Sequence, residues 1–216
     1  MAVEFAAFCT RNPKPCPLIE ITPPGDPEPA RSGPGADIRT DLPGYRVYRH
    51  GQLVEKRGEI RDLWRDDLVA FLLGCSLTFE HALIEAGVGV RNVELGTLVP
   101  MFVSSLACRP AGRFHGFQVV TMRPIPERQV QLARDVTRGY PHAHGAPVHI
   151  GNPEANRDQR SGSTRLWRAR RDPTRRSAGL LGLWSDAASS GARIVSGIDD
   201  HPRAGDHVPD RPASRG

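Results

Sequence analysis

The sequence predicts an α/β fold, a mixed sheet with flanking helices, over residues 1–154, followed by a disordered tail. Segments of strand and helix periodicity alternate in the first part, which is typical of α/β proteins. That part also holds 44 Leu, Ile, Val, Phe and Met residues, whereas the last 62 residues hold only 8. Ordering a residue costs about 1–2 kcal/mol, which burial of so few apolar side chains in the tail cannot offset.

The first quarter of the chain predicts one helix and three strands. Apolar residues share one face over residues 3–9, which favours a helix. Alternating prolines prevent a helix over 12–17, and the apolar segment 18–21 then predicts a short buried strand. Alternation on both sides of a His-Gly turn predicts a hairpin over 45–56.

The middle of the chain predicts two helices in succession. The first and strongest runs from Asp62 as N-cap to Gly74, with a continuous apolar segment in its second half. The second begins at Thr78 and ends at Gly87. Further on, we expect a strand over 117–122.

A third helix and a last strand complete the expected body. Pro126 suits the first position of a helix that ends at Arg138, before a glycine. Residues 147–150 then predict a strand. The sequence contains no internal repeat.

The charge of the chain is unevenly distributed. The formal net charge is +5, and the tail from residue 155 accounts for all of it, with twelve Arg, seven Asp and neither Lys nor Glu. Residues 165–176 contain six Arg and Trp167, a composition that could bind nucleic acid through phosphate contacts and base stacking. We favour a solvated charged segment with no nucleic-acid partner, because Asp and Pro interrupt any continuous basic face.

Composition and the N-terminus lead us to expect a cytoplasmic protein with no membrane partner. No apolar segment approaches the 18 residues of a membrane span. The first residues lack the basic start and apolar stretch of a signal peptide. The four cysteines match neither a zinc motif nor a dense disulfide framework.

Three groups of side chains could carry chemistry. His142, His144 and His149 could bind a metal, but they match no zinc motif, so we favour hydrogen-bonded surface residues and expect neither metal nor cofactor. Cys75 precedes a helix that begins near Glu80 and His81, which would supply a general base. The simpler interpretation is that Cys75 is a buried thiol without a chemical role and that Glu80 interacts only with the helix dipole.

The third group is the Gly/Pro-containing segment 109–116. Arg109, Arg113 and His115 lie on it just before a predicted strand. Guanidinium groups bind carboxylate or phosphate in a bidentate way, so this segment is either a substrate-binding loop or a solvated basic loop. By contrast, Gly33-x-Gly35 is not followed by a helix, which excludes a dinucleotide-binding fingerprint.

Nine segments resemble the D-glutamate cyclase family of bacterial hydro-lyases. The resemblance runs in register over about residues 2–154. The segments that carry it are 11–17, 35–43, 45–49, 62–69, 73–76, 79–83, 108–116, 122–125 and 144–151.

The resemblance implies a two-part α/β structure, with a three-layer piece and a smaller α+β subdomain. It implies an enzyme that removes water from a small carboxylate or amino acid, such as D-glutamate cyclising to 5-oxo-D-proline. This chemistry requires cations that hold carboxylates and groups that move protons. We expect Arg39, Arg109, Arg113 and Arg123 to bind carboxylates, and Glu80, His81, His115, His144 and His149 to move protons.

At both ends the chain departs from the family pattern, which predicts an incomplete member. Relatives begin several tens of residues earlier, and the pattern stops after Glu154. Segments 182–188 and 202–210 can both be encoded so that one skipped nucleotide yields family-like sequence, which indicates a frameshift. A gene without a single-base insertion or deletion near codon 155 would contradict this. The alternative to an active hydro-lyase is therefore an inactive, truncated product.

Overall fold

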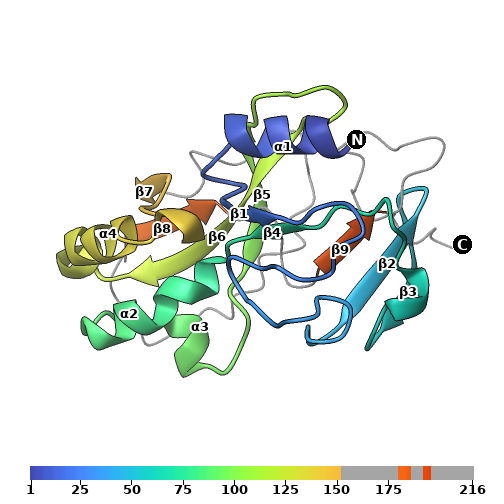
Figure 1. Cartoon of the computed structure of the whole chain (residues 1–216). Coiled ribbons are helices and arrows are strands. Elements are labelled where there is room, and N and C mark those ends of the chain that lie inside the picture. The colour runs from blue at the N-terminus through green and yellow to red at the C-terminus, as the bar shows by residue number, and fades with distance from the viewer. Residues whose placement is uncertain (152–179, 186–191, 196–216) are drawn as a thin grey trace, which may run out of the picture.

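The computed structural model describes residues 1–151, 180–185 and 192–195 of the 216-residue chain. Its described strands form three sheets, which follow one another across the molecule in Figure 1: a four-stranded sheet of order β5-β6-β8-β7, a β1–β4 pair, and a three-stranded sheet of order β3-β2-β9. Short helices fill the connections.

The four-stranded sheet and three helices enclose the largest described core. Its strands are β5 (Met101–Ala107), β6 (Phe117–Ile125), β7 (His149–Gly151) and β8 (Leu180–Ser185), all antiparallel to their neighbours. The helices are α2 (Glu80–Glu85), α3 (Arg91–Glu94) and α4 (Val130–Arg138), and 3-10 turns lie at Ser76–Phe79, Glu127–Gln129 and Pro141–Ala143. The core side chains come from α2, β6, α4 and the segments between them: Phe79, Leu83, Val88, Val90, Ile125, Ala133 and Ala143.

Helix α1 (Ala2–Arg11) packs over the small pair of strands β1 (Leu18–Ile21) and β4 (Phe71–Leu73). The rings of Phe5 and Phe71 meet edge to face with centroids 4.8 Å apart. Beside them, Phe8 and two buried thiols of the α1 region pack against Ala111 of the β5–β6 connection. This second core therefore joins the N-terminal segment to the connection that carries Arg109 and Arg113.

The third sheet is built on the expected hairpin of β2 (Tyr45–Arg49) and β3 (Gln52–Arg57). His50 and Gly51 both have positive φ, 48° and 75°, the conformation of a type I′ turn. Strand β9 (Ala192–Val195) adds to β2 in parallel.

Most of the expected elements are present. The sequence predicts α1, β1, the β2–β3 hairpin, α2, β6, α4 and β7 in the correct order. Strand β6 is longer than expected, and the helix expected from Pro126 begins with a 3-10 turn before α4. The mixed α/β class is therefore confirmed for the described residues.

The helix expected over residues 62–74 is wrong. The chain there forms a 3-10 turn at Arg61–Leu63, then a loop, then β4. Its backbone bonds to residues far away in sequence: Gly25 N–H donates to Leu68 O at 2.8 Å, and Thr22 N–H donates to Ala70 O at 3.0 Å. Trp64 Nε1 also donates to Gly25 O at 2.8 Å. These tertiary bonds outweigh the modest intrinsic preference for a helix.

Strand β1 forms as expected but buries its glutamate rather than its two isoleucines. Ile19 and Ile21 are 39% and 38% exposed, whereas Glu20 is buried. The Glu20 carboxylate accepts hydrogen bonds from Arg31 N–H, Ser32 N–H and Ser32 Oγ at 2.6–3.0 Å. A buried polar group needs such partners, so Glu20 serves to hold the 22–44 loop against the strand.

In the tail, the structure describes two short strands, β8 and β9. Strand β8 lies between β6 and β7, and β9 lies beside β2. The other tail residues, including the basic segment 165–176, lie outside the described residues. Within the described part, no helix has the length and apolarity needed to cross a membrane.

Candidate functional site

A buried ion pair joins α2 to β6. Arg123 is 1% exposed, and its Nη2 and Nε donate to Glu80 Oε1 at 2.6 and 3.1 Å. Glu80 opens α2, whose first turn follows directly on the 3-10 turn at Ser76–Phe79, and Arg123 lies on the inner face of β6. The fold thus brings together two residues that are 43 positions apart in the sequence.

Three neutral side chains complete this buried polar cluster, defined here as Ser76, Glu80, Asn92, Thr121 and Arg123. Arg123 donates to Thr121 Oγ1 at 3.0 Å and to Ser76 Oγ at 3.3 Å. Asn92 Nδ2 donates to Glu80 Oε1 at 3.1 Å. The Phe79 ring lies 5.0 Å from the guanidinium carbon and adds a cation–π contact.

Such a cluster is costly to bury. Desolvating two charges costs several kcal/mol per ion, which the pair recovers only through good geometry and additional hydrogen bonds. The three hydrogen bonds that Arg123 and Asn92 donate to Glu80 all converge on Oε1. Among the described residues, none donates to Oε2, and the Glu80 side chain is 10% exposed. Oε2 is therefore the oxygen that can accept a proton from a small molecule.

His144 lies in a constrained position next to this region. It is 1% exposed and has a left-handed φ of 73°, which is uncommon for a residue with a side chain. Its Nδ1 lies 2.8 Å from Lys14 O, and because a carbonyl oxygen only accepts, Nδ1 donates this hydrogen bond. It directly follows the 3-10 turn at Pro141–Ala143, which packs against the one at Ser76–Phe79.

Lys14 holds the other side of that loop. Its Nζ donates to the carbonyl oxygens of His144 and Ala146, at 3.2 and 2.5 Å. Burial lowers the pKa of Lys14 below its usual value. The lysine backbone and side chain together fix the position of the His144 loop.

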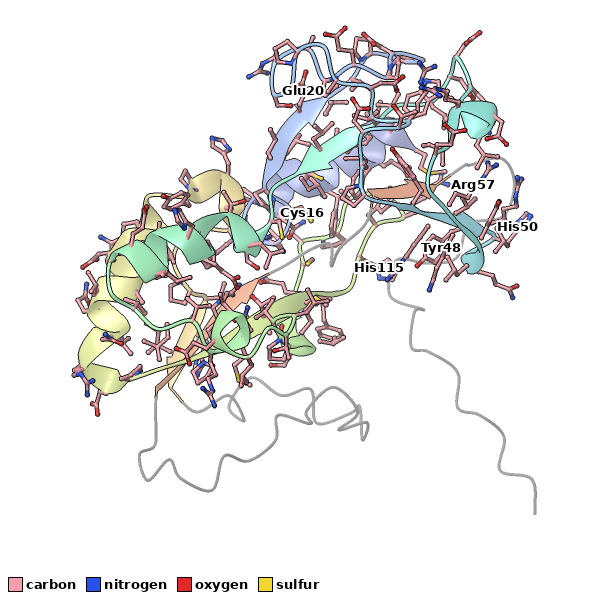
Figure 2. All side chains as sticks on the ribbon, turned by 90° about the horizontal axis from the view of Figure 1, so that it is seen from below. Cys16, Glu20, Tyr48, His50, Arg57 and His115 are labelled. Carbon is pink, nitrogen blue, oxygen red and sulfur yellow. The ribbon has the colours of Figure 1, made fainter. Side chains whose placement is uncertain are left out.

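The remaining predicted proton carriers lie elsewhere. His81 is exposed on α2 and pairs with Glu85 at 3.0 Å. His149 lies half-buried on β7. His115 is exposed on the β5–β6 connection, and Figure 2 shows it far from α2. Among the described residues, no three His, Cys, Asp or Glu side chains are placed to hold a metal ion.

The predicted arginine loop is anchored rather than assembled into a pocket. Asn12 accepts from Arg109 N–H at 2.7 Å and donates to Arg109 O at 2.8 Å. Arg113 Nε pairs with Glu4 at 2.7 Å, which lowers the pKa of Glu4. The side chains of Arg109 and Arg113 are exposed, as expected both for a substrate-binding loop and for a solvated basic loop.

Arg39, the fourth predicted carboxylate ligand, already binds a carboxylate of its own loop. It pairs with Asp37 through Nε and Nη2 at 2.9 and 2.8 Å. This contact lowers the pKa of Asp37 to about 2. The structure therefore brings together only Glu80 and Arg123 of the nine predicted residues in direct contact.

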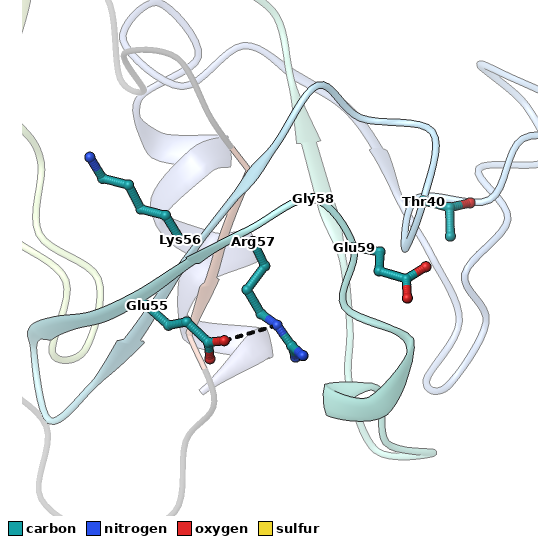
Figure 3. A pocket seen from close by; sticks show the side chains of 6 residues that line it. All are labelled: Thr40, Glu55, Lys56, Arg57, Gly58 and Glu59. Atoms are coloured by element: carbon teal, nitrogen blue, oxygen red, sulfur yellow. Dashed lines mark ion pairs between the residues drawn. The ribbon is translucent and has the colours of Figure 1, made fainter.

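Two surface hollows are lined by residues outside the buried polar cluster. The larger, of about 490 Å³, is lined by Thr40, Glu55, Lys56, Arg57, Gly58 and Glu59. Figure 3 shows Arg57 paired there with Glu55, at 3.0 Å, and it also pairs with Asp62. The charge of Arg57 is therefore already compensated. The second hollow, of about 330 Å³, is mostly apolar and lies between α2 and α3.

Sequence reasoning missed three members of the cluster. Ser76, Asn92 and Thr121 are ordinary polar residues whose roles appear only when the fold brings them to Arg123. For Ser76, the position immediately before a predicted helix was a weak signal. For Asn92 and Thr121, the sequence offers none.

The chain matches a family model described as D-glutamate cyclase over residues 69–158. It is 54% identical to Putative hydro-lyase GK2103 of Geobacillus kaustophilus over 154 residues, which are 71% of this chain and 59% of that protein. It is 52% identical to Putative hydro-lyase YcsI of Bacillus subtilis over 155 residues, 72% of this chain and 60% of that protein.

A third relative, a putative hydro-lyase of Nocardioides sp., is 56% identical over 154 residues, 71% of this chain and 57% of that protein. The chain therefore spans about three fifths of the length of these curated relatives. All five residues of the buried polar cluster lie within the range that matches the family model. They come from the turn before α2, from α2, from α3 and from β6.

Proposed function

The matched part of the chain belongs to the D-glutamate cyclase family of hydro-lyases, and on this basis we propose that the protein removes water from a small carboxylate at the buried polar cluster. The observation that carries the proposal is the Arg123–Glu80 pair. It joins a carboxylate-binding cation to a proton-accepting oxygen within one set of hydrogen bonds. Buried ion pairs surrounded by hydrogen-bonding side chains occur at functional sites.

D-glutamate is the substrate that we propose to test first. In its cyclisation the amine nitrogen bonds to the side-chain carboxyl carbon, and one carboxyl oxygen leaves. The ammonium group loses two protons, and both depart with that oxygen as water, so the reaction involves no oxidation or reduction. Groups that take each of the two protons from nitrogen and return it to the departing oxygen satisfy this balance.

Within this proposal, Glu80 Oε2 is the atom that moves the proton. Its partner oxygen is held by Arg123 and Asn92, which fixes the direction of the carboxylate. The hydroxyl oxygens of Ser76 and Thr121 accept hydrogen bonds from Arg123. In this proposal their O–H groups, together with Arg123, donate to the carboxyl group that loses its oxygen. Preorganised donors of this type stabilise charge that develops in a transition state.

His144 is the second proton carrier that we propose. Its Nδ1 donates to the Lys14 carbonyl, so Nε2 is the nitrogen that would move a proton. The loop that carries it packs beside the turn that carries Ser76. His81, exposed and paired with Glu85, has no role in this scheme.

A substrate screen tests the reaction class. The purified full chain would be incubated with D-glutamate, L-glutamate and a panel of small hydroxy and amino acids, with products followed by proton NMR. We expect 5-oxo-D-proline from D-glutamate, or loss of water from another member of the panel. A chain that melts cooperatively by circular dichroism and dehydrates no member would contradict the proposal.

A further inference from the structure

The ammonium group of Lys14 carries a positive charge that no carboxylate of the described residues balances. Its Nζ donates to two backbone carbonyl oxygens, those of His144 and Ala146, at 3.2 and 2.5 Å. Burial alone lowers the pKa of Lys14, with no contribution from a neighbouring charge. Cys16, two positions further along, marks this segment in Figure 2.

A cation in this position has the properties of an anion-binding group. Removing a charge from water is costly unless an opposite charge accompanies it, and two carbonyl dipoles supply only part of that compensation. An ammonium group has three N–H donors, so the two carbonyl oxygens leave one donor for another acceptor. Lys14 is half-buried and therefore not enclosed by the protein. A small anion would provide both the missing charge and the missing acceptor.

The backbone around Lys14 holds this ammonium group in one place. Prolines precede and follow it, and their rings restrict the backbone on both sides. Lys14 O accepts from His144 Nδ1 at 2.8 Å, while Lys14 Nζ donates back to His144 O. Two hydrogen bonds in opposite directions thus join the two segments. A cation fixed in this way loses little freedom when it binds a ligand.

The same contacts place Lys14 beside the buried polar cluster. Gly74 N–H donates to Pro17 O at 2.9 Å, three positions after Lys14. Gly74 also lies so close to the loop before His144 that a Cβ on it would be 1.6 Å from His142 O. Ser76 of the cluster follows Gly74 by two positions. The Lys14 segment, the His144 loop and the turn that carries Ser76 therefore meet at Gly74.

We propose that Lys14 binds the carboxylate that the reaction leaves unaltered. The inference rests on the proposed function, with D-glutamate as the example. In its cyclisation the side-chain carboxyl group loses an oxygen at the cluster, whereas the α-carboxylate keeps its negative charge from substrate to product. Arg123 is already paired with Glu80, so the α-carboxylate requires a cation of its own.

The other candidate cations fit this task less well. Arg39 and Arg113 each already pair with a carboxylate of this chain. Arg109 is exposed, and attraction between charges is weak in water. Lys14 is partly removed from water and has no such partner among the described residues, so it attracts a carboxylate more strongly.

Nuclear magnetic resonance of the full chain tests this site without turnover. The chain contains only two lysines, Lys14 and the exposed Lys56. Lysine labelled with ¹³C at Cε and ¹⁵N at Nζ therefore gives two signals, which a Lys56→Arg variant assigns. Glutarate, a dicarboxylate that has no amine and cannot cyclise, should shift the Lys14 signal saturably and leave Lys56 in place. Its uncharged diamide should shift neither signal.

Signals that move alike for both lysines, a Lys14 signal that glutarate leaves unchanged, or an equal response to the diamide would each overturn the proposal. Because glutarate undergoes no reaction, this result is separate from the substrate screen. Saturable binding at Lys14 in a chain that dehydrates nothing would contradict the proposed reaction but not the carboxylate site. Turnover without a Lys14 response would do the reverse.

A pair of variants separates binding from a structural role. Lys14→Gln, with folding checked by circular dichroism, should bind glutarate about tenfold or more weakly in calorimetry, the loss expected for a hydrogen bond to a charged group. Lys56→Gln is the matched control and should bind as wild type does. A folded Lys14→Gln variant that melts earlier but binds glutarate as well as the control would show that Lys14 only joins the two segments. If Lys14→Gln does not fold, the wild-type titration decides.

Discussion

Asn12 shows how one polar side chain can join two distant segments. It is buried, and it bonds to Phe8 O, Arg109 O and Arg109 N–H. Two of these bonds cross 97 positions of sequence. Nothing in the run of prolines around Asn12 indicates this role, because it depends entirely on the position of the β5–β6 connection.

Replacing Asn12 by Ala should lower the free energy of unfolding by about 1–3 kcal/mol, since two lost hydrogen bonds leave part-buried backbone groups of Arg109 unsatisfied. Urea denaturation followed by circular dichroism measures this change. Thr10→Ala on the same helix is the control: its hydroxyl bonds only to Ala6 O at an exposed position. Equal stability of the two variants would contradict the anchoring role of Asn12.

The contact of Asp37 with Arg39 leads us to predict how stability depends on pH. Its hydrogen bonds and charge contact with Arg39 lower its pKa from 3.8 to about 2. A carboxyl group with a lowered pKa in the folded state contributes stability above its unfolded pKa and loses that contribution as the pH falls through the folded value. Wild-type stability should therefore fall between pH 4 and pH 2 more steeply than that of Asp37→Asn, in urea titrations at each pH. Parallel curves would refute this.

At the scale of elements, the prediction for residues 62–74 was wrong for an instructive reason. A continuous apolar segment fits a helix and a buried strand equally well by periodicity alone. The deciding bonds come from residues 17–25, and Gly74 N–H itself donates to Pro17 O at 2.9 Å. By contrast, the hairpin at 45–57 was predictable because its turn chemistry is local.

Gly74 is a packing constraint rather than the end of a helix. A Cβ at this position would lie 1.6 Å from His142 O, so the loop before His144 could not keep its place. Gly74→Ala should lower the free energy of unfolding by at least about 2 kcal/mol. Gly58→Ala is the matched control, because a Cβ there meets nothing within 4 Å. A Gly74→Ala variant as stable as Gly58→Ala would contradict this packing.

In the candidate site, too, the individual residues could be identified from the sequence, but their contacts could not. Glu80 and Arg123 were identifiable as charged residues within recognisable motifs. Their contact was not, because it requires α2 to pack on β6. The arginine loop was identifiable too, but its anchors, Asn12 and Glu4, lie about a hundred positions away.

At the scale of the whole molecule, the two described strands of the tail each join a sheet that is otherwise formed by residues 1–151. Leu180–Ser185 contains the tail's longest apolar segment, and it forms the strand between β6 and β7. The amides of β8 should therefore exchange with deuterium as slowly as those of β6. Exchange followed by mass spectrometry measures both, and immediate exchange at 180–185 would show that the tail does not complete the sheet.

The central claim is that the Arg123–Glu80 pair performs the loss of water. Steady-state turnover of D-glutamate by Arg123→Lys and Glu80→Gln tests it most directly, with Arg138→Lys and Glu85→Gln as exposed controls on α4 and α2. Folded Arg123→Lys and Glu80→Gln should each lose about 100-fold or more in kcat, the size of a general acid–base contribution, while the controls match wild type. Wild-type turnover in either cluster variant would contradict the claim.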